Sequence, residues 1–194
     1  MDYVNEFIVK GKVVAVKNGT HPSIRLVSKA GKKETFPLIY CTKKMLDSLH
    51  IKPGMRIETK GAIRTFYNKS DNGDYTRRQA FHAESISVGE SLCAQKFGVK
   101  GAFYDDMSTN VYLSGILMSK RVRDDGWASA YVRVSDSDMN TIKVNFKETP
   151  QSSSLQKGDH ICLVGLISTV NKTFGEKNYH YENIVVNDIG KIDE

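Results

Sequence analysis

The sequence predicts an all-β protein that consists of two tandem five-stranded Greek-key barrels. Three observations predict this class: an internal repeat, alternation of apolar and polar residues along most segments, and turns rich in glycine, asparagine and aspartate. The 194 residues leave room for two domains of about 100 residues each, and domains of that size can bury a core without disulfides or metals.

The repeat has an ungapped offset of 104 residues. Three glycines and seven other positions share it: Gly11, Gly54, Gly61, Phe7, Val9, Val13, Ile57, Ile63, Thr65 and Tyr75 recur as Gly115, Gly158, Gly165, Val111, Leu113, Leu117, Ile161, Ile167, Thr169 and Tyr179. We therefore expect an N-terminal domain over 1–90, a linker over 91–106 and a C-terminal domain over 107–194.

The first half predicts three strands, a helix and two strands. The strands are expected over 4–16, 24–27, 34–40, 55–67 and 75–88, with a short helix that Thr42 caps and Pro53-Gly54 ends. This order, with a helix between strands three and four, is that of the OB-fold. Glycines within its first and fourth strands fit the sharp coiling of a small barrel.

The second half predicts the same scheme. Its strands are expected over 111–121, 127–134, 142–146, 160–170 and 178–189. The segment 149–154 stands in place of the helix and is expected to form only a turn.

Composition excludes several protein classes. No run approaches the roughly 18–20 apolar residues of a membrane span, and the N-terminus lacks the apolar region of a signal peptide. Cys41, Cys93 and Cys162 are odd in number and widely spaced, which predicts free thiols and neither disulfides nor zinc ligands. We expect an intracellular protein.

The sequence contains no recognisable catalytic or metal-binding motif. His21, His50, His82, His160 and His180 are scattered, and the acidic pairs Asp71/Asp74 and Asp136/Asp138 lie in polar, turn-like segments. The expectation is a protein that is not an enzyme and has no cofactor. A nuclease site assembled from distant carboxylates is an open alternative.

Positive charge is concentrated in the first half. The chain carries a formal charge of +6, but residues 1–94 hold 16 Lys and Arg against 9 Asp and Glu, whereas residues 95–194 hold 12 against 13. The first half is therefore the better candidate for contacts with phosphates.

Aromatic residues and cations alternate around the turn between the last two strands of the first half. Single-stranded nucleic acids are bound by this combination, because bases stack on aromatic rings while Lys and Arg neutralise phosphates. The predicted binding residues are Arg64, Phe66, Tyr67, Lys69, Tyr75, Arg77 and Arg78, with Lys17, Arg25, Lys32 and Lys33 on neighbouring elements. The alternative is that the aromatics close the barrel and the cations are solvated.

The second half carries the same pattern with fewer cations. Its candidates are Lys172, Phe174, Lys177, Tyr179 and Tyr181 at the equivalent hairpin, and Arg121, Arg123 and Trp127 near its second strand. Having no net positive charge, this half is expected to bind more weakly or to mediate dimer contacts.

The chain resembles the bacterial single-stranded-DNA-binding protein family. Segment 61–73 looks like that family's glycine-containing fourth strand and basic, aromatic hairpin, and segment 40–61 like its aromatic–helix–Gly–strand–Gly stretch. In the second half, segments 157–165, 179–181 and 184–189 look like the same strands. The resemblance places base-stacking aromatics at Tyr40, at Phe66 or Tyr67, and at Phe146.

Three departures from the family are visible. Glu34 occupies the position of a stacking Trp, the hairpin between strands two and three is short, and the chain ends at Glu194 without an acidic recruiting tail. The missing tail predicts a specialised protein of a phage, plasmid or other mobile element that lacks the usual recruiting function. The resemblance implies a homodimer, which would assemble four OB domains.

The predicted function is sequence-tolerant binding of single-stranded DNA during replication, recombination or DNA transfer in the cytoplasm of a bacterial host. The competing prediction is an OB-fold adaptor of a replication or conjugation complex that binds proteins and no nucleic acid. The residues do not distinguish DNA from RNA.

Overall fold

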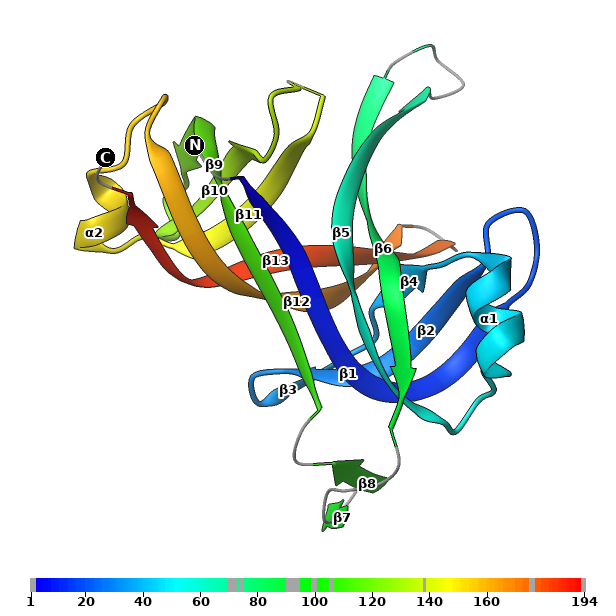
Figure 1. Ribbon diagram of the computed structural model, residues 1–194. Helices are drawn as coiled ribbons and strands as arrows, with labels where there is room; N and C mark the ends of the chain where they lie inside the picture. The colour runs from blue at the N-terminus through cyan, green and yellow to red at the C-terminus, as the bar shows by residue number, and fades with distance from the viewer. Residues whose placement is uncertain are drawn as a thin grey trace.

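The computed structural model describes residues 3–69, 73, 75–89, 95–98, 101–104, 107–137, 139–174 and 177–192, and gives only the backbone at 95–98, 101–104, 172, 174 and 177–179. Its strands are β1 (Val4–Lys17), β2 (Ser23–Ala30), β3 (Lys33–Thr35), β4 (Leu38–Tyr40), β5 (Arg56–Lys69), β6 (Tyr75–Val88), β7 (Gln95–Gly98), β8 (Gly101–Tyr104), β9 (Ser108–Val122), β10 (Trp127–Arg133), β11 (Thr141–Lys147), β12 (His160–Phe174) and β13 (Lys177–Lys191). Two short helices complete it, α1 (Lys43–Leu49) and α2 (Pro150–Ser153). The prediction of an all-β chain is confirmed (Figure 1).

Each half forms a closed circuit of strand pairs. In the first half β1 pairs with β2, β2 with β4, β4 in parallel with β6, β6 with β5, and β5 with β1. In the second half β9, β10, β11, β13 and β12 close in the same way, and β11 with β13 is again the parallel pair. The expected third strand of the first half is split into β3 and β4, which pair with different parts of β2.

Strands β1 and β9 join the two circuits into one sheet. They run antiparallel with Phe7 opposite Val111, and these two residues are also equivalent in the repeat. An antiparallel pair in which a residue faces its own repeat implies an approximate two-fold axis at that point. The halves are therefore related by this axis, and buried residues of both halves form one continuous core.

Alternation along the strands produces this core. Phe7, Val9 and Val13 of β1 are buried, as are Val111, Leu113 and Leu117 at the repeated positions of β9. Within the first half, the rings of Phe7 and Phe81 meet edge to face with centroids 5.4 Å apart.

The repeated glycines occupy positions that a larger residue would disturb. Gly54 and Gly158 adopt φ values of +94° and +96°, which favour glycine. A Cβ at Gly11 would lie 2.5 Å from the carbonyl oxygen of Val27, and one at Gly115 would clash with the carbonyl of Arg133. Backbone geometry thus accounts for their recurrence.

Each half has one short helix, of seven residues in α1 and four residues in α2. Thr42 caps α1 as predicted, since its side chain accepts a hydrogen bond from the Met45 amide. The second half was expected to have only a turn at 149–154, but α2 forms there. Thr149 and Ser152 make a reciprocal capping box and Pro150 occupies the first turn, which together stabilise a helix of four residues.

The segment expected to be a linker contains two short strands, β7 and β8, which pair with each other. The expected turn at 70–73 lies outside the described residues apart from Gly73, as do Asp71, Asp74, Cys93 and Asp138. Cys41 and Cys162 are free thiols.

Candidate nucleic-acid interface

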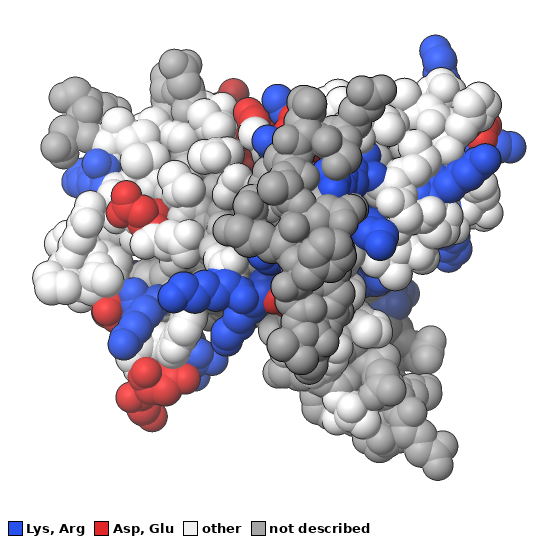
Figure 2. Space-filling model, turned by 90° about the horizontal axis from the view of Figure 1, so that it is seen from below, with Lys and Arg blue, Asp and Glu red and all other residues white. Residues whose placement is uncertain are grey.

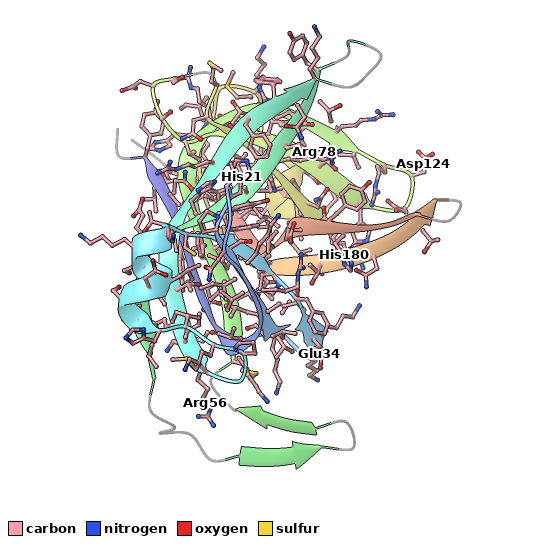
Figure 3. The ribbon with its side chains drawn as sticks, turned by 90° about the vertical axis from the view of Figure 1, so that its right-hand side faces the viewer. His21, Glu34, Arg56, Arg78, Asp124 and His180 are labelled. Carbon is pink, nitrogen blue, oxygen red and sulfur yellow. The ribbon has the colours of Figure 1, made fainter. Side chains whose placement is uncertain are left out.

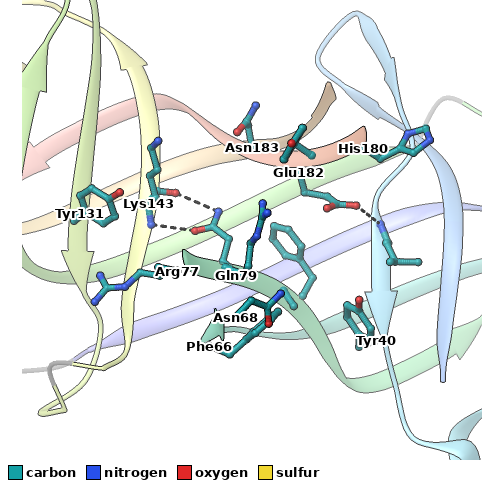
Figure 4. A pocket seen from close by; sticks show the side chains of 15 residues that line it. Tyr40, Phe66, Asn68, Arg77, Gln79, Tyr131, Lys143, His180, Glu182 and Asn183 are labelled. Atoms are coloured by element: carbon teal, nitrogen blue, oxygen red, sulfur yellow. Dashed lines mark hydrogen bonds between the residues drawn. The ribbon is translucent and has the colours of Figure 1, made fainter. Parts of the chain in front are cut away.

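A groove of about 440 Å³ lies between the two halves (Figure 4). Strands β4, β5 and β6 form one wall, and β10, β11 and β13 form the other. Its lining residues are Leu38, Tyr40, Phe66, Asn68, Arg77, Arg78, Gln79, Ala80, Phe81, Tyr131, Lys143, His180, Tyr181, Glu182 and Asn183. Five of these, Tyr40, Phe66, Arg77, Arg78 and Tyr181, were predicted from the sequence as binding residues.

The β5–β6 hairpin is braced against the second half. The Gln79 side chain accepts a hydrogen bond from the Lys143 amide at 3.0 Å and donates one to the Lys143 carbonyl at 3.3 Å (Figure 4). The Thr65 hydroxyl donates to the Met139 carbonyl at 2.5 Å. Seen from the side, this hairpin projects above the β12–β13 hairpin (Figure 3).

The second half makes the reciprocal contacts. The Thr169 hydroxyl lies 2.6 Å from that of Thr35 and accepts a bond from the Phe36 amide at 2.5 Å. Thr65 and Thr169 are repeat equivalents, and so are their partner positions 35 and 139. These contacts follow the approximate two-fold axis and fix the width of the groove.

Two arginines are held against aromatic rings at the groove. The Arg77 guanidinium lies 5.3 Å from the ring centroid of Tyr67 and 5.7 Å from that of Tyr131, and it donates to the Tyr67 hydroxyl. Arg78 lies 5.8 Å from the ring of Tyr181. Such cation–π contacts restrict the side chains while leaving guanidinium donors for phosphate oxygens.

Three aromatic residues of the first half line the groove, of which Phe81 is buried and Tyr40 and Phe66 have accessible rings. Phe66 is 41% exposed. Tyr40 stacks on His82 with ring centroids 5.3 Å apart and planes at 21°. Burial, followed by the charge of Arg64, lowers the pKa of His82, so the imidazole is neutral at pH 7. A neutral, stacked imidazole supports Tyr40 without adding charge.

Glu182 introduces a carboxylate into the groove. One of its oxygens accepts a hydrogen bond from the Leu38 amide at 3.3 Å, and it lies 4.0 Å from Arg25. Burial raises its pKa, although Arg25 and the Leu38 amide act in the opposite direction. Arg25 also donates to the Phe36 carbonyl at 2.8 Å, so this predicted binding residue is engaged within the protein.

The other predicted residues whose side chains the structure describes do not line the groove. Phe146 is only 2% exposed, because it occupies an inward-facing position of β11, so its predicted stacking on a base would require the ring to leave the core. Trp127 is half-buried, whereas eight residues are exposed: Lys17, Lys32, Lys33, Arg64, Tyr67, Lys69, Tyr75 and Arg121. Arg123 is exposed and paired with Asp125. The side chains of Lys172, Phe174, Lys177 and Tyr179 lie outside the described residues.

Sequence reasoning missed several lining residues, notably Tyr131, Lys143 and Glu182. Tyr131 and Lys143 lie on β10 and β11, opposite each other in register. The outer face of strands two and three is a usual OB-fold binding surface, so alternation along these strands could have identified them. Glu182 was not predicted, because a carboxylate is not a residue type expected at a phosphate-binding surface.

Charge is dispersed on one other face of the molecule. On the face seen from below, the coloured Lys and Arg side chains occupy several separate places, interrupted by Asp and Glu (Figure 2). In the described part of the chain, no group of three or more His, Cys, Asp or Glu could hold a metal ion. Neither of the helices described has the length and apolar content that crossing a membrane requires.

Comparison with known proteins shows the fold. No family model matches the chain, and no curated protein matches its sequence. Among solved structures, the wild-type single-stranded DNA binding protein from Thermus aquaticus matches over 100% of this chain and 95% of that one, with a TM-score of 0.66 and 14% identity. A deletion mutant of that protein matches with a TM-score of 0.65 and 14% identity, over 100% of this chain and 96% of that one. The chain thus shares the fold of the Thermus aquaticus protein.

Proposed function

We propose that this protein binds single-stranded DNA with little dependence on sequence, through two tandem OB barrels formed by residues 1–90 and 107–194. The observation that carries the proposal is the groove between the halves, where Tyr40 and Phe66 face the same space as Arg77, Arg78 and Lys143. Rings for stacking and cations for phosphates are the two components that such binding needs. The shared fold with the Thermus aquaticus protein supports the proposal. The protein would act in replication, recombination or DNA transfer of a bacterial cell or mobile element.

The test is a fluorescence-anisotropy titration of a labelled poly-dT oligonucleotide at two salt concentrations, with duplex DNA as competitor. We expect tight, salt-sensitive binding that duplex DNA does not displace, and much weaker binding by a triple variant with Tyr40, Phe66 and Tyr67 replaced by Ala. Absent binding at low salt would overturn the proposal in favour of the adaptor role. Unchanged affinity of a folded triple variant would overturn the site alone.

We also propose that two copies associate through the outer face of the central sheet. Val4, Tyr112 and Val164 are exposed on β1, β9 and β12, and Tyr112 and Val164 are direct neighbours in register. A homodimer would cover these three exposed apolar side chains and bring four barrels together. Light scattering should give the mass of a dimer for the wild type and of a monomer for Val164→Asp, and a monomeric wild type would contradict the proposal.

A further inference from the structure

Glu182 is the only acid among the described residues that line the groove, where the other charged side chains include Arg77, Arg78 and Lys143. Its side chain is 18% exposed, and Figure 4 shows it on β13, pointing across the groove toward β4. The hydrogen bond from the Leu38 amide uses only one of the two carboxylate oxygens of Glu182, so this bond does not account for the whole group.

The charge of Glu182 restricts which part of a nucleic acid can lie over it. A carboxylate repels a phosphate, so the backbone of a bound strand is expected to follow the arginines and Lys143 instead. A base offers a different surface, because the exocyclic amine of cytosine donates hydrogen bonds that a carboxylate accepts. Thymine presents a carbonyl oxygen at the corresponding position, which a carboxylate repels.

The surroundings of Glu182 favour such a contact. Tyr40 lies two residues from Leu38, and both line the groove. A base that stacks on a ring keeps its edge free for hydrogen bonding. Partial burial strengthens a hydrogen bond to the carboxylate, because fewer water molecules compete for it. The neighbouring cation Arg25 is 4.0 Å away, beyond good hydrogen-bonding distance, and leaves acceptor capacity on the carboxylate.

We propose that Glu182 determines specificity in the groove, making it favour single strands rich in cytosine over strands of thymine. The inference rests on the proposed binding of single-stranded DNA and limits its tolerance of sequence at the one position where a base faces Glu182. The contact is made by the carboxylate and the cytosine 4-amino group, so it disappears when either partner is altered.

The experiment compares labelled oligonucleotides of equal length made of cytosine, thymine or N4,N4-dimethylcytosine, by anisotropy at pH 8. We expect the wild type to bind the cytosine strand about 5- to 20-fold more tightly than the thymine strand. The dimethylated strand, which keeps the ring but has no amine donor, should lose this advantage. In Glu182→Gln the ratio between cytosine and thymine should fall below about twofold.

Glu58→Gln is the matched control. It removes the same charge on β5, where Glu58 binds Lys10 and Lys60 and does not line the groove. This variant should strengthen binding to both strands alike and leave their ratio unchanged. Glutamine at position 182 can still accept the bond from Leu38, and thermal unfolding will show whether that variant is folded. If it is not, the wild-type comparison of cytosine with its dimethylated form decides the question.

Equal wild-type affinity for cytosine and thymine strands would overturn the inference while leaving the proposed function intact. A ratio that Glu182→Gln leaves unchanged would do the same. Failure of both strands to bind at low salt would overturn the proposed function, and this inference with it.

Discussion

The two halves of the molecule have the same scaffold and different groove walls. Gly54 and Gly158 share an unusual φ, and Phe7 and Val111 face each other across the two-fold axis. At the groove, by contrast, the offset of 104 residues relates Arg77 to Tyr181 and Arg78 to Glu182. Positions set by backbone contacts have recurred, whereas positions that face solvent in the groove have diverged. At these two positions the first half therefore contributes cations, whereas the second half contributes an aromatic ring and a carboxylate.

Tyr40 and Phe146 show how small a difference in position separates surface from core. Tyr40 is the last residue of β4, before α1, and Phe146 is the second-last residue of β11, before α2. Tyr40 is half-buried beside the inward-facing Ile39, whereas Phe146 shares the inward face of β11 with Ile142 and Val144. Because side chains alternate along a strand, a shift by one residue exchanges the two environments.

The largest effect is expected from replacing Tyr40 and Phe146 separately by Ala. Phe146→Ala should lower the free energy of unfolding by about 3–5 kcal/mol through the cavity it leaves. Tyr40→Ala should leave stability nearly unchanged and weaken binding to single strands by about 1–3 kcal/mol. Denaturant unfolding and anisotropy titration of both variants check this. A Tyr40→Ala protein as unstable as Phe146→Ala would refute the assignment of the two rings to different roles.

A smaller effect is expected from removing the two arginines of the groove. Replacing Arg77 and Arg78 by Ala should reduce affinity about 10- to 50-fold at 0.1 M salt, and should lower the slope of log affinity against log salt by about 1.4, because two phosphate contacts are lost. The control replaces Arg121 and Arg123 by Ala, which removes the same charge from the second half outside the groove. An equal loss in both double variants would show that the groove is not the main binding surface.

The smallest effect concerns two carboxylates with opposite pKa shifts. Burial raises the pKa of Glu182 above its usual range. Burial also acts upward on Glu58, but its hydrogen bonds and ion pairs with Lys10 and Lys60 outweigh this and lower its pKa. The folded protein therefore retains the Glu182 proton more strongly than the unfolded chain, and releases that of Glu58 more readily.

The contribution of Glu182 to stability is consequently present at low pH and is lost as the pH rises through its raised pKa. That of Glu58 is present above the ordinary glutamate pKa and is lost on acidification. At pH 7 we expect Glu182→Gln to be at least as stable as the wild type, and Glu58→Gln to be less stable by under about 1 kcal/mol. Thermal unfolding between pH 4 and 8 measures both. The same pH profile in the two variants would contradict the opposite signs.

The sequence by itself determined the local elements. Alternation along 75–88 predicted β6 with the bounds observed, Thr42 predicted the start of α1, and the 104-residue repeat predicted two similar sets of strands. These features depend on neighbours in the chain, through side-chain alternation, capping and the conformational demands of glycine. The basic hairpin was also visible, because its cations and rings are adjacent in sequence.

Only the tertiary structure decided where the groove lies and what it contains. It depends on the pairing of β1 with β9 and on contacts such as Gln79 with Lys143, which join residues 64 positions apart. The burial of Phe146 was not predicted, because its inward orientation follows from the register of β11 within the closed circuit. The contacts of Glu182 could not be predicted either, because its neighbours Leu38 and Arg25 come from the other half of the chain. Side chains from distant strands meet only after the sheet has closed, and no local pattern in the sequence encodes that meeting.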